Sequence, residues 1–383
     1  MRKDIKRIIT EEVDNKANQL IRLSTQIHND PEQAWEEHRA SMLTGDILLE
    51  NGFAVERGIC GLATAFKARY GNGKPAIAFI AEYDALPEIG HGCGHNIIAA
   101  AAVGAGIASR KIVDLCGGSV LVMGCPAEEK LGGKVIMMKN GAFNGIDAAL
   151  MVHPIAGGRN WAGFRSTASI SIEVDFWGRE SHAAANPWDG MSALEGLILA
   201  FNNINSARLH FKERGRINGI IVDGGRSPNT IPEHGAGVFI LRASDDEYLE
   251  DLKRIAIRCF EGAAKASETR VEYRWGMQCA VMQNSPILAE LWKKNMRSLG
   301  LEVEESVENS ASTDMGNVSR VIPSMHSFVS ISSKSIAFHS CEFTEAAGSE
   351  EAQKATLNGA KALAMTASDI FDDPKILLKL EEM

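Results

Sequence analysis

The sequence predicts an α/β fold in which a mostly parallel sheet flanked by helices is interrupted by a smaller α+β domain. Three observations predict it. Short apolar runs alternate with helical segments in the first part of the chain, as in a parallel sheet. Near residue 165 the strands change to alternating polar and apolar residues, which is typical of a sheet with one exposed face. After about residue 277 the first pattern returns.

The first predicted domain starts with helices and continues with buried strands. Residues 4–50 are predicted to be helical, with one break near Asn29-Asp30-Pro31. Buried strands and helices are expected to alternate at 76–81, 97–109, 119–125, from about 132, and 148–152. The second of these segments consists almost only of Ala, Ile, Val and Gly, a composition that predicts a helix buried on most faces.

The second predicted domain is an insert with the order β-α-β-β-α-β. Its strands and helices are expected at 169–176, 191–207, 217–223, 235–243, 246–266 and 270–275. This order predicts a ferredoxin-like arrangement. Because 383 residues exceed the usual size of one hydrophobic core, two domains are expected. We assign 1–166 and 277–383 to the first domain and 167–276 to the insert.

Composition excludes several classes of protein. Forty basic against 49 acidic residues give a net charge of −9, which argues against nucleic acid as a partner. No run approaches the roughly 18 apolar residues that span a membrane, and the start lacks a secretory signal. We therefore expect a cytoplasmic protein without a membrane partner. Seven scattered cysteines, an odd number, are expected to be reduced thiols.

The strongest chemical signal is the segment Gly90-His91-Gly92-Cys93-Gly94-His95-Asn96, which follows Glu82-Tyr83-Asp84 and a predicted buried strand. In open α/β sheets, ligands bind beyond the carboxyl ends of strands, and this loop lies at such a position. Thiolate and imidazole are preferred ligands of zinc-like metals. The alternative is a turn with incidental histidines. We favour a metal site at Cys93 and His95.

Further ligands are predicted at the ends of other strands. Glu128-Glu129 follows one buried strand, where one carboxylate is suited to hold a metal and its neighbour to act as a base. His153 ends a third strand, and His339 lies far downstream in the returning domain. Taken alone, each of these histidines is more often a structural residue than a metal ligand. With Cys93 and His95, the ligands Glu129, His153 and His339 suffice for a pair of metals.

The chain resembles the aminoacylase/carboxypeptidase family of co-catalytic, zinc-peptidase-like metallopeptidases. Within it, the chain is similar to the branch of auxin-conjugate amidohydrolases, p-aminobenzoyl-glutamate hydrolases and β-alanyl-lysine dipeptidases. The likeness covers nearly the whole chain, and its segments are IHNDPE from residue 27, AEYDALP, GHGCGHN, PAEE, SHAA, PNTIP, LRA and FHS.

This resemblance implies a role for each residue of the cluster. Cys93 would bridge two metals, which His95 and His153 complete on one side and Glu129 and His339 on the other. Glu128 would be the general base for a metal-activated water, and Asp84 would orient a ligand. The metals would be two divalent transition ions, zinc or manganese, with cobalt or nickel as further candidates.

The resemblance also assigns three residues of the insert. His182 would reach across a homodimer formed through the insert and polarise the substrate carbonyl. Asn229 and Arg242 would face the active site, where a guanidinium suits a substrate carboxylate. Simpler interpretations stay open for all three: His182 as a cap of the following helix, Asn229 as a turn residue between two prolines, and Arg242 as an ion-pair partner of Asp245 or Asp246.

The sequence departs from the family pattern beside the cluster. Many relatives have Asp followed by a further His where this chain reads Asn96-Ile97-Ile98. This change bears mainly on the substrate. It also raises the hypothesis that one metal site is weakened and a single tightly held metal suffices. His91 is expected beside the cluster rather than as a ligand.

The predicted function is metal-dependent hydrolysis of a small amide substrate that carries a carboxylate. Candidates are an N-acyl amino acid, a dipeptide or an aminobenzoyl-glutamate-like conjugate. Three alternatives remain at this point: a hydrolytic deaminase of an aromatic amino acid, a non-catalytic metal- or peptide-binding relative, and a thiol enzyme with Cys93 as nucleophile.

Overall fold

A computed structural model describes residues 2–130, 132–305, 307–308 and 311–382. The chain forms two compact units. Unit 1 consists of Met1–Arg165, Met282–Asn309 and Thr313–Met383, and unit 2 of Ser166–Val281 and Ser310–Ser312.

Unit 1 is built on an eight-stranded sheet of order β1-β2-β4-β3-β5-β16-β6-β14. These strands are β1 (Ala54–Arg57), β2 (Phe66–Asn72), β3 (Ala76–Glu82), β4 (Gly118–Cys125), β5 (Ala148–Ala156), β6 (Asn160–Trp161), β14 (Val303–Glu304) and β16 (Ser324–Ser332). The central strands β4, β3, β5 and β16 are parallel neighbours, while β2 pairs antiparallel with β1 and β4. The predicted mostly parallel sheet is confirmed. A separate short pair joins β7 (Phe164–Arg165) to β15 (Val307–Glu308).

The central strand β3 shows why these segments are continuous apolar runs. Ile77 and Phe79 point into one hydrophobic core, whereas Ala78 and Ile80 point into a second core on the opposite face. A strand covered on both faces has no side that favours polar residues.

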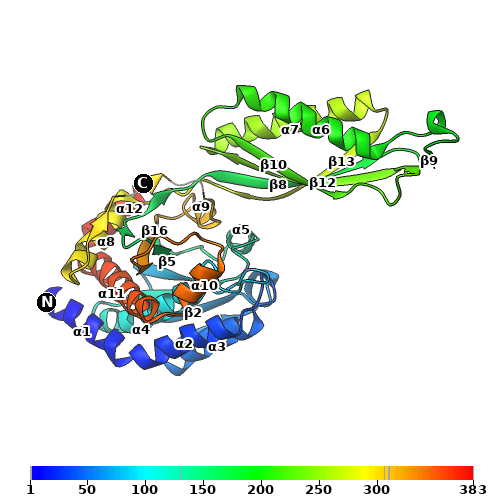
Figure 1. Cartoon of the computed structure of the whole chain (residues 1–383). Helices are drawn as coiled ribbons and strands as arrows, with labels where there is room; N and C mark the ends of the chain where they lie inside the picture. The colour runs from blue at the N-terminus through cyan, green and yellow to red at the C-terminus, as the bar shows by residue number, and fades with distance from the viewer. Residues whose placement is uncertain (1, 131, 306, 309–310, 383) are drawn as a thin grey trace. The chain divides into compact units, whose positions relative to one another are not determined.

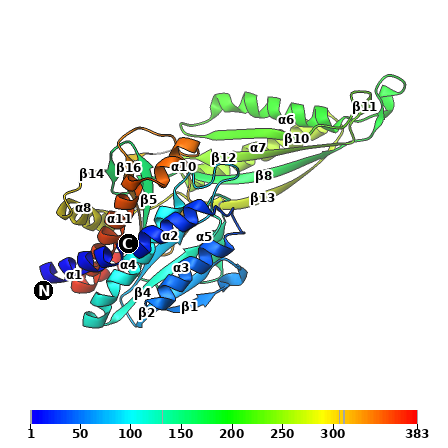
Figure 2. The same cartoon turned by 60° about the horizontal axis from the view of Figure 1, so that its bottom comes forward.

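Helices cover both faces of this sheet. They are α1 (Arg2–Asn15), α2 (Ala17–Asn29), α3 (His38–Glu50), α4 (His95–Cys116), α5 (Gly133–Lys139), α8 (Pro286–Ser298), α9 (Met315–Val318), α10 (Cys341–Ala347), α11 (Glu350–Asp372) and α12 (Pro374–Glu381). Figures 1 and 2 show α4 and α11 together along one face, and they pack directly on each other. Of the described helices, only α4 is long and apolar enough to cross a membrane, yet 89% of its most apolar window is buried in the protein. It is therefore packed as a core helix.

Unit 2 contains a four-stranded antiparallel sheet of order β10-β12-β8-β13. Its elements follow the chain as β8 (Ala168–Trp177), α6 (Ala193–Ala207), β10 (Arg216–Asp223), β12 (His234–Ala243), α7 (Asp246–Ala266) and β13 (Arg270–Cys279). Figure 1 shows α6 and α7 on one face of this sheet. The order of elements is the predicted β-α-β-β-α-β. Strand β13 continues past the predicted end of the insert at 276, because it pairs with β8 as far as Cys279.

Candidate metal centre

The predicted ligands of unit 1 lie at the carboxyl ends of neighbouring parallel strands. Cys93 and His95 follow β3, Glu129 follows β4, and His153 is in the last part of β5. Because these strands are adjacent and parallel, their carboxyl ends lie at one edge of the sheet. His339 comes from the loop between β16 and α10.

These side chains converge into two groups that share one thiol. Ligand atoms of Cys93, His95 and His153 lie within 4.8 Å of one another, and so do those of Cys93, Glu129 and His339. The Cys93 sulfur is 3.5 Å from His153 Nε2. Glu129 Oε2 is 3.6 Å from His339 Nε2, and Glu129 Oε1 is 3.8 Å from His95 Nε2.

The donor atoms fit a pair of metal ions. His95 Nε2 and Glu129 Oε1 are buried and have no hydrogen-bond partner among the described residues. Such an unpaired polar atom costs roughly 1–3 kcal/mol, so its retention needs a compensating partner. Ligand atoms about 2.0–2.3 Å from a tetrahedral zinc-like ion stand roughly 3.5 Å from one another, which for nitrogen and oxygen is longer than a hydrogen bond. The observed spacing of 3.5–3.8 Å matches this arrangement.

Asp84 orients two of the ligands. Its Oδ1 is 2.9 Å from His95 Nδ1, and its Oδ2 accepts a hydrogen bond of 2.9 Å from the Glu129 backbone N–H. The first contact leaves His95 Nε2 directed at the cluster. Burial alone would raise the pKa of Asp84, but His95, the Glu129 backbone N–H and Lys134 together more than offset this, and the pKa is lowered. Asp84 is thus suited to be the carboxylate that supports His95 if this histidine binds a metal.

Unusual backbone geometry places the ligands. Gly94 has φ +78, and a Cβ there would lie 2.5 Å from Pro154 Cγ, so glycine is required between Cys93 and His95. Ala127, just before Glu128, has φ 56, and His339 has φ 60. Both are held by backbone hydrogen bonds: Ala127 N–H donates to Glu37 and His339 N–H to Gly92. Positive φ at non-glycine residues clusters at functional sites.

The structure adds two charged residues that were not named from the sequence, Lys134 and Asp314, and brings both to Glu82. Lys134, at the start of α5, is fully buried and ion-paired to both Glu82 and Asp314. Ligand oxygens of Glu82, Asp314 and Glu128 lie within 4.8 Å of one another. Burial, and then the carboxylates of Glu82 and Glu129, raise the pKa of Glu128 well above its usual range. Glu82 was visible in the AEYDALP segment, but only the fold brings Lys134 and Asp314 to it.

Asn96 and His91 bond to neighbouring helices. Asn96 Nδ2 donates to Ser24 Oγ at 2.9 Å and to the Ala347 carbonyl at 3.1 Å. His91 Nε2 is 3.1 Å from the Ile27 carbonyl. An aspartate could not donate either bond of Asn96, so this departure from the family pattern has a packing reason.

The three candidate residues of the insert lie in unit 2, each with local partners. His182 is exposed, and its Nδ1 accepts from the backbone N–H groups of Ala184 and Ala185 at 3.2 and 3.0 Å. The Asn229 carbonyl accepts from Ala183 N–H at 2.9 Å. Arg242 Nη1 donates to Ser312 Oγ at 2.7 Å. Burial lowers the pKa of the Arg242 guanidinium.

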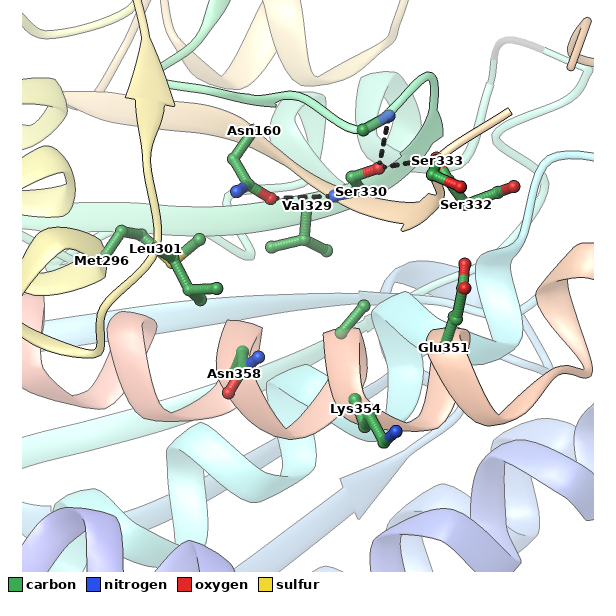
Figure 3. A pocket seen from close by; sticks show the side chains of 12 residues that line it. Asn160, Met296, Leu301, Val329, Ser330, Ser332, Ser333, Glu351, Lys354 and Asn358 are labelled. Carbon is green, nitrogen blue, oxygen red and sulfur yellow. Dashed lines mark hydrogen bonds between the residues drawn. The ribbon is translucent and has the colours of Figure 1, made fainter. Parts of the chain in front are cut away.

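A separate pocket of about 320 Å³ lies in unit 1 (Figure 3). Ser330 and Ser332, near the end of β16, line one side, and Glu351, Lys354 and Asn358 of α11 line another. None of the predicted site residues lines it. It is therefore distinct from the metal-ligand cluster.

Comparison with known proteins places the chain in a family. Residues 78–367 match the model of peptidase family M20/M25/M40. Xaa-Arg dipeptidase of Mus musculus is 38% identical, with 97% of this chain and 90% of that protein covered. One of the subunits of p-aminobenzoyl-glutamate hydrolase of Escherichia coli is 33% identical over 72% of this chain and 62% of that protein.

A solved structure supports the fold assignment. A dinuclear metal-binding peptidase of the M20 family from Bacillus subtilis superposes with a TM-score of 0.71 at 18% identity, covering 94% of this chain and 99% of that one. The chain therefore belongs to peptidase family M20/M25/M40 and is a hydrolase of amide bonds.

Proposed function

We propose that this hydrolase uses two divalent metal ions to cleave dipeptides or related N-acyl conjugates next to a carboxylate-bearing residue. The observation that carries the proposal is the pair of ligand groups that share Cys93. Cys93, His95 and His153 would hold one ion, and Cys93, Glu129 and His339 the other. A metal pair supplies Lewis acidity, which lowers the pKa of water and polarises a carbonyl. Zinc and manganese are the first candidates, with cobalt and nickel next. A cysteine ligand favours the softer ions.

Glu128 is the proposed general base. It adjoins the ligand Glu129 and is 8% exposed, so its carboxylate is screened from bulk water. In the proposed reaction Glu128 accepts a proton from the attacking water and returns it to the leaving nitrogen. The positive φ of Ala127 and its bond to Glu37 fix the backbone directly before this side chain.

His182 is the proposed polarising residue, supplied to the site of a second chain. Its Nδ1 accepts two backbone hydrogen bonds, so the neutral ring carries its proton on Nε2. That N–H is a suitable donor to a carbonyl oxygen. Asn229 and Arg242 are proposed to contact the substrate, with Arg242 binding its carboxylate.

A homodimer through the insert is consistent with its exposed edge. Strand β10 is at the edge of the unit 2 sheet and exposes Ile220, Ile221 and Val222 by 65%, 44% and 56%. An apolar edge strand is a template for pairing with another chain. We propose that a second copy covers it. A cytoplasmic location stays a prediction.

The first test compares two neighbouring carboxylates. Glu128→Gln should retain its metal but lose about 10²–10⁴-fold in kcat, the usual contribution of a general base. Glu129→Gln should instead lose metal. Elemental analysis and hydrolysis of a dipeptide panel, beginning with C-terminal arginine dipeptides because of the Xaa-Arg dipeptidase relative, measure both effects. A Glu128→Gln enzyme with near-normal kcat would refute the assignment of the base.

A further inference from the structure

We propose that Lys134 is a positioning residue of the centre: its ammonium is a permanent internal cation that holds Glu82 and Asp314 in place beside Glu128. The inference rests on the hydrolase function proposed above. It concerns a lysine and an aspartate outside both ligand groups. Lys134 reaches the reaction only through the two carboxylates that it binds.

The contacts of Lys134 define a closed buried unit. Its Nζ is 2.5 Å from Glu82 Oε1 and 2.5 Å from Asp314 Oδ1. Its backbone N–H donates to the other oxygen of Asp314 at 2.9 Å. The side chains of all three residues are fully buried. A lysine is almost never buried to this degree unless it is paired. The two ion pairs therefore hold the ammonium in one place.

This unit is next to the proposed base. One carboxylate oxygen each of Glu82, Glu128 and Asp314 lies within 4.8 Å of the others. Three carboxylates at this separation repel one another strongly in a buried site unless a cation is among them. The Lys134 ammonium supplies that positive charge without a metal. Its removal would leave Glu128 facing two uncompensated carboxylates.

Glu82 connects the same unit to the metal ligands. Its Oε1 is bound by Lys134, while its Oε2 is 3.6 Å from His95 Nε2. Oε2 is buried and has no hydrogen-bond partner in the described part of the chain. While Lys134 binds Oε1, the Glu82 carboxylate keeps its orientation. Without Lys134, Glu82 would be free to rotate and compete as a ligand at the His95 site.

The backbone next to Lys134 packs against the loop that carries Glu128. Gly133 precedes Lys134, and a Cβ at Gly133 would stand only 1.7 Å from the Pro126 carbonyl oxygen. Helix α5 therefore begins in direct contact with the segment Pro126 to Glu129. A displacement of Lys134 would be transmitted to this loop by contact as well as by charge.

The test is Lys134→Met, which keeps most of the length of the side chain and removes its charge. We expect kcat to fall by about 10–100-fold, as for other partners of metal-site residues, with little change in KM. After exchange of the metals for Co²⁺, we also expect a shifted visible absorption spectrum, because Glu82 perturbs the His95 site. Lys139→Met, on the exposed end of the same helix, is the matched control and should change neither quantity.

A charge-balanced double variant separates positioning from simple structural support. Lys134→Met with Asp314→Asn restores the net charge of the unit and should recover part of the lost kcat and of the Co²⁺ spectrum. A folded Lys134→Met enzyme with wild-type kcat and spectrum, or one that only melts earlier, would overturn the proposal. If Lys134→Met does not fold, Asp314→Asn alone takes its place. It should shift the spectrum and lower kcat, and no change in either would overturn the proposal.

This outcome is separable from failure of the proposed function. Wild-type protein without metal-dependent amide hydrolysis would refute the function before any variant is made. Metal-dependent wild-type protein with an unaffected Lys134→Met variant would refute only the role of Lys134.

Discussion

The two units differ in whether the polar atoms of their candidate residues have hydrogen-bond partners. In unit 1, His95 Nε2 and Glu129 Oε1 are buried and unpaired within the described residues, although they face other polar atoms. In unit 2, His182 is exposed and binds backbone N–H groups of its own turn, and Arg242 binds Ser312. The cluster of unit 1 thus contains buried polar atoms that no described residue pairs, as expected if a bound group completes it. His182 and Arg242 of the insert already have hydrogen-bond partners within unit 2.

This difference indicates which assignments the fold supports by itself. A buried polar atom without a partner is costly, so its presence points to a bound group. An exposed histidine that completes a turn has a sufficient structural reason. The proposed metal ligands are therefore supported by contacts within this chain, whereas the proposed role of His182 needs a second chain. The following experiments test that contrast, from the largest expected effect to the smallest.

Cys93→Ala should have the largest effect, because Cys93 belongs to both ligand groups. We expect loss of metal and a decrease in kcat/KM above the roughly 100-fold that outer ligand partners cause. Cys60→Ala is the control, since Cys60 is a half-buried free thiol outside both groups. Alkylation of wild-type Cys93 should be blocked by bound metal. If activity survives chelator but not alkylation, Cys93 is a nucleophile instead.

Mixing two inactive variants tests the role of His182 across a dimer. Glu128→Gln and His182→Ala chains, exchanged into mixed dimers, should regain up to about a quarter of wild-type activity, because half the dimers are mixed and each has one intact site. Each variant incubated alone is the control. The absence of any recovery, with chain exchange verified by mass, would contradict a site shared between chains.

Asp84→Asn should weaken metal binding without removing any ligand. The amide can no longer offer two carboxylate oxygens to His95 and to the Glu129 N–H, and outer partners of this kind contribute about 10–100-fold in affinity. Competition with a chelator measures the change. Asp114→Asn, at an exposed carboxylate bonded to Tyr70, is the control. An unchanged metal affinity would contradict a role of Asp84 in orienting the ligands.

Asn96→Asp should have the smallest effect on the metals and act on stability. Loss of the bonds to Ser24 and Ala347, together with a buried carboxylate, should cost about 1–3 kcal/mol and lower Tm by several degrees. Ser24→Ala should cost less, since it removes one bond. A metal content that rises in Asn96→Asp would instead revive the hypothesis of a single metal in the wild-type chain.

Local sequence patterns were sufficient for much of the fold and for naming the residues of unit 1 that the structure brings together. Helix α7 runs over Asp246–Ala266 as predicted, and its start is capped by the Asp245 side chain. Cys93 and His95 could be predicted as ligands because they stand two residues apart in a glycine-rich loop after a strand. Strand β16 (Ser324–Ser332) was not predicted from the sequence, because its many serines hide a buried strand.

Long-range contacts set the limit of prediction from sequence. Glu82 and Lys134 are 52 residues apart, and Lys134 and Asp314 are 180 apart. Each is an ordinary charged residue within its own segment. Their importance comes only from burial in one place, and no local periodicity encodes that. For His182, Asn229 and Arg242, the assigned roles still come from the resemblance to the family.

Metal content per chain tests the central claim most directly. We expect two transition-metal ions per chain in protein purified without chelator. Dipeptide hydrolysis should be lost on chelation and restored by zinc or manganese. Protein that binds no metal, or that hydrolyses amides equally well in excess chelator, would contradict the two-metal centre built on Cys93.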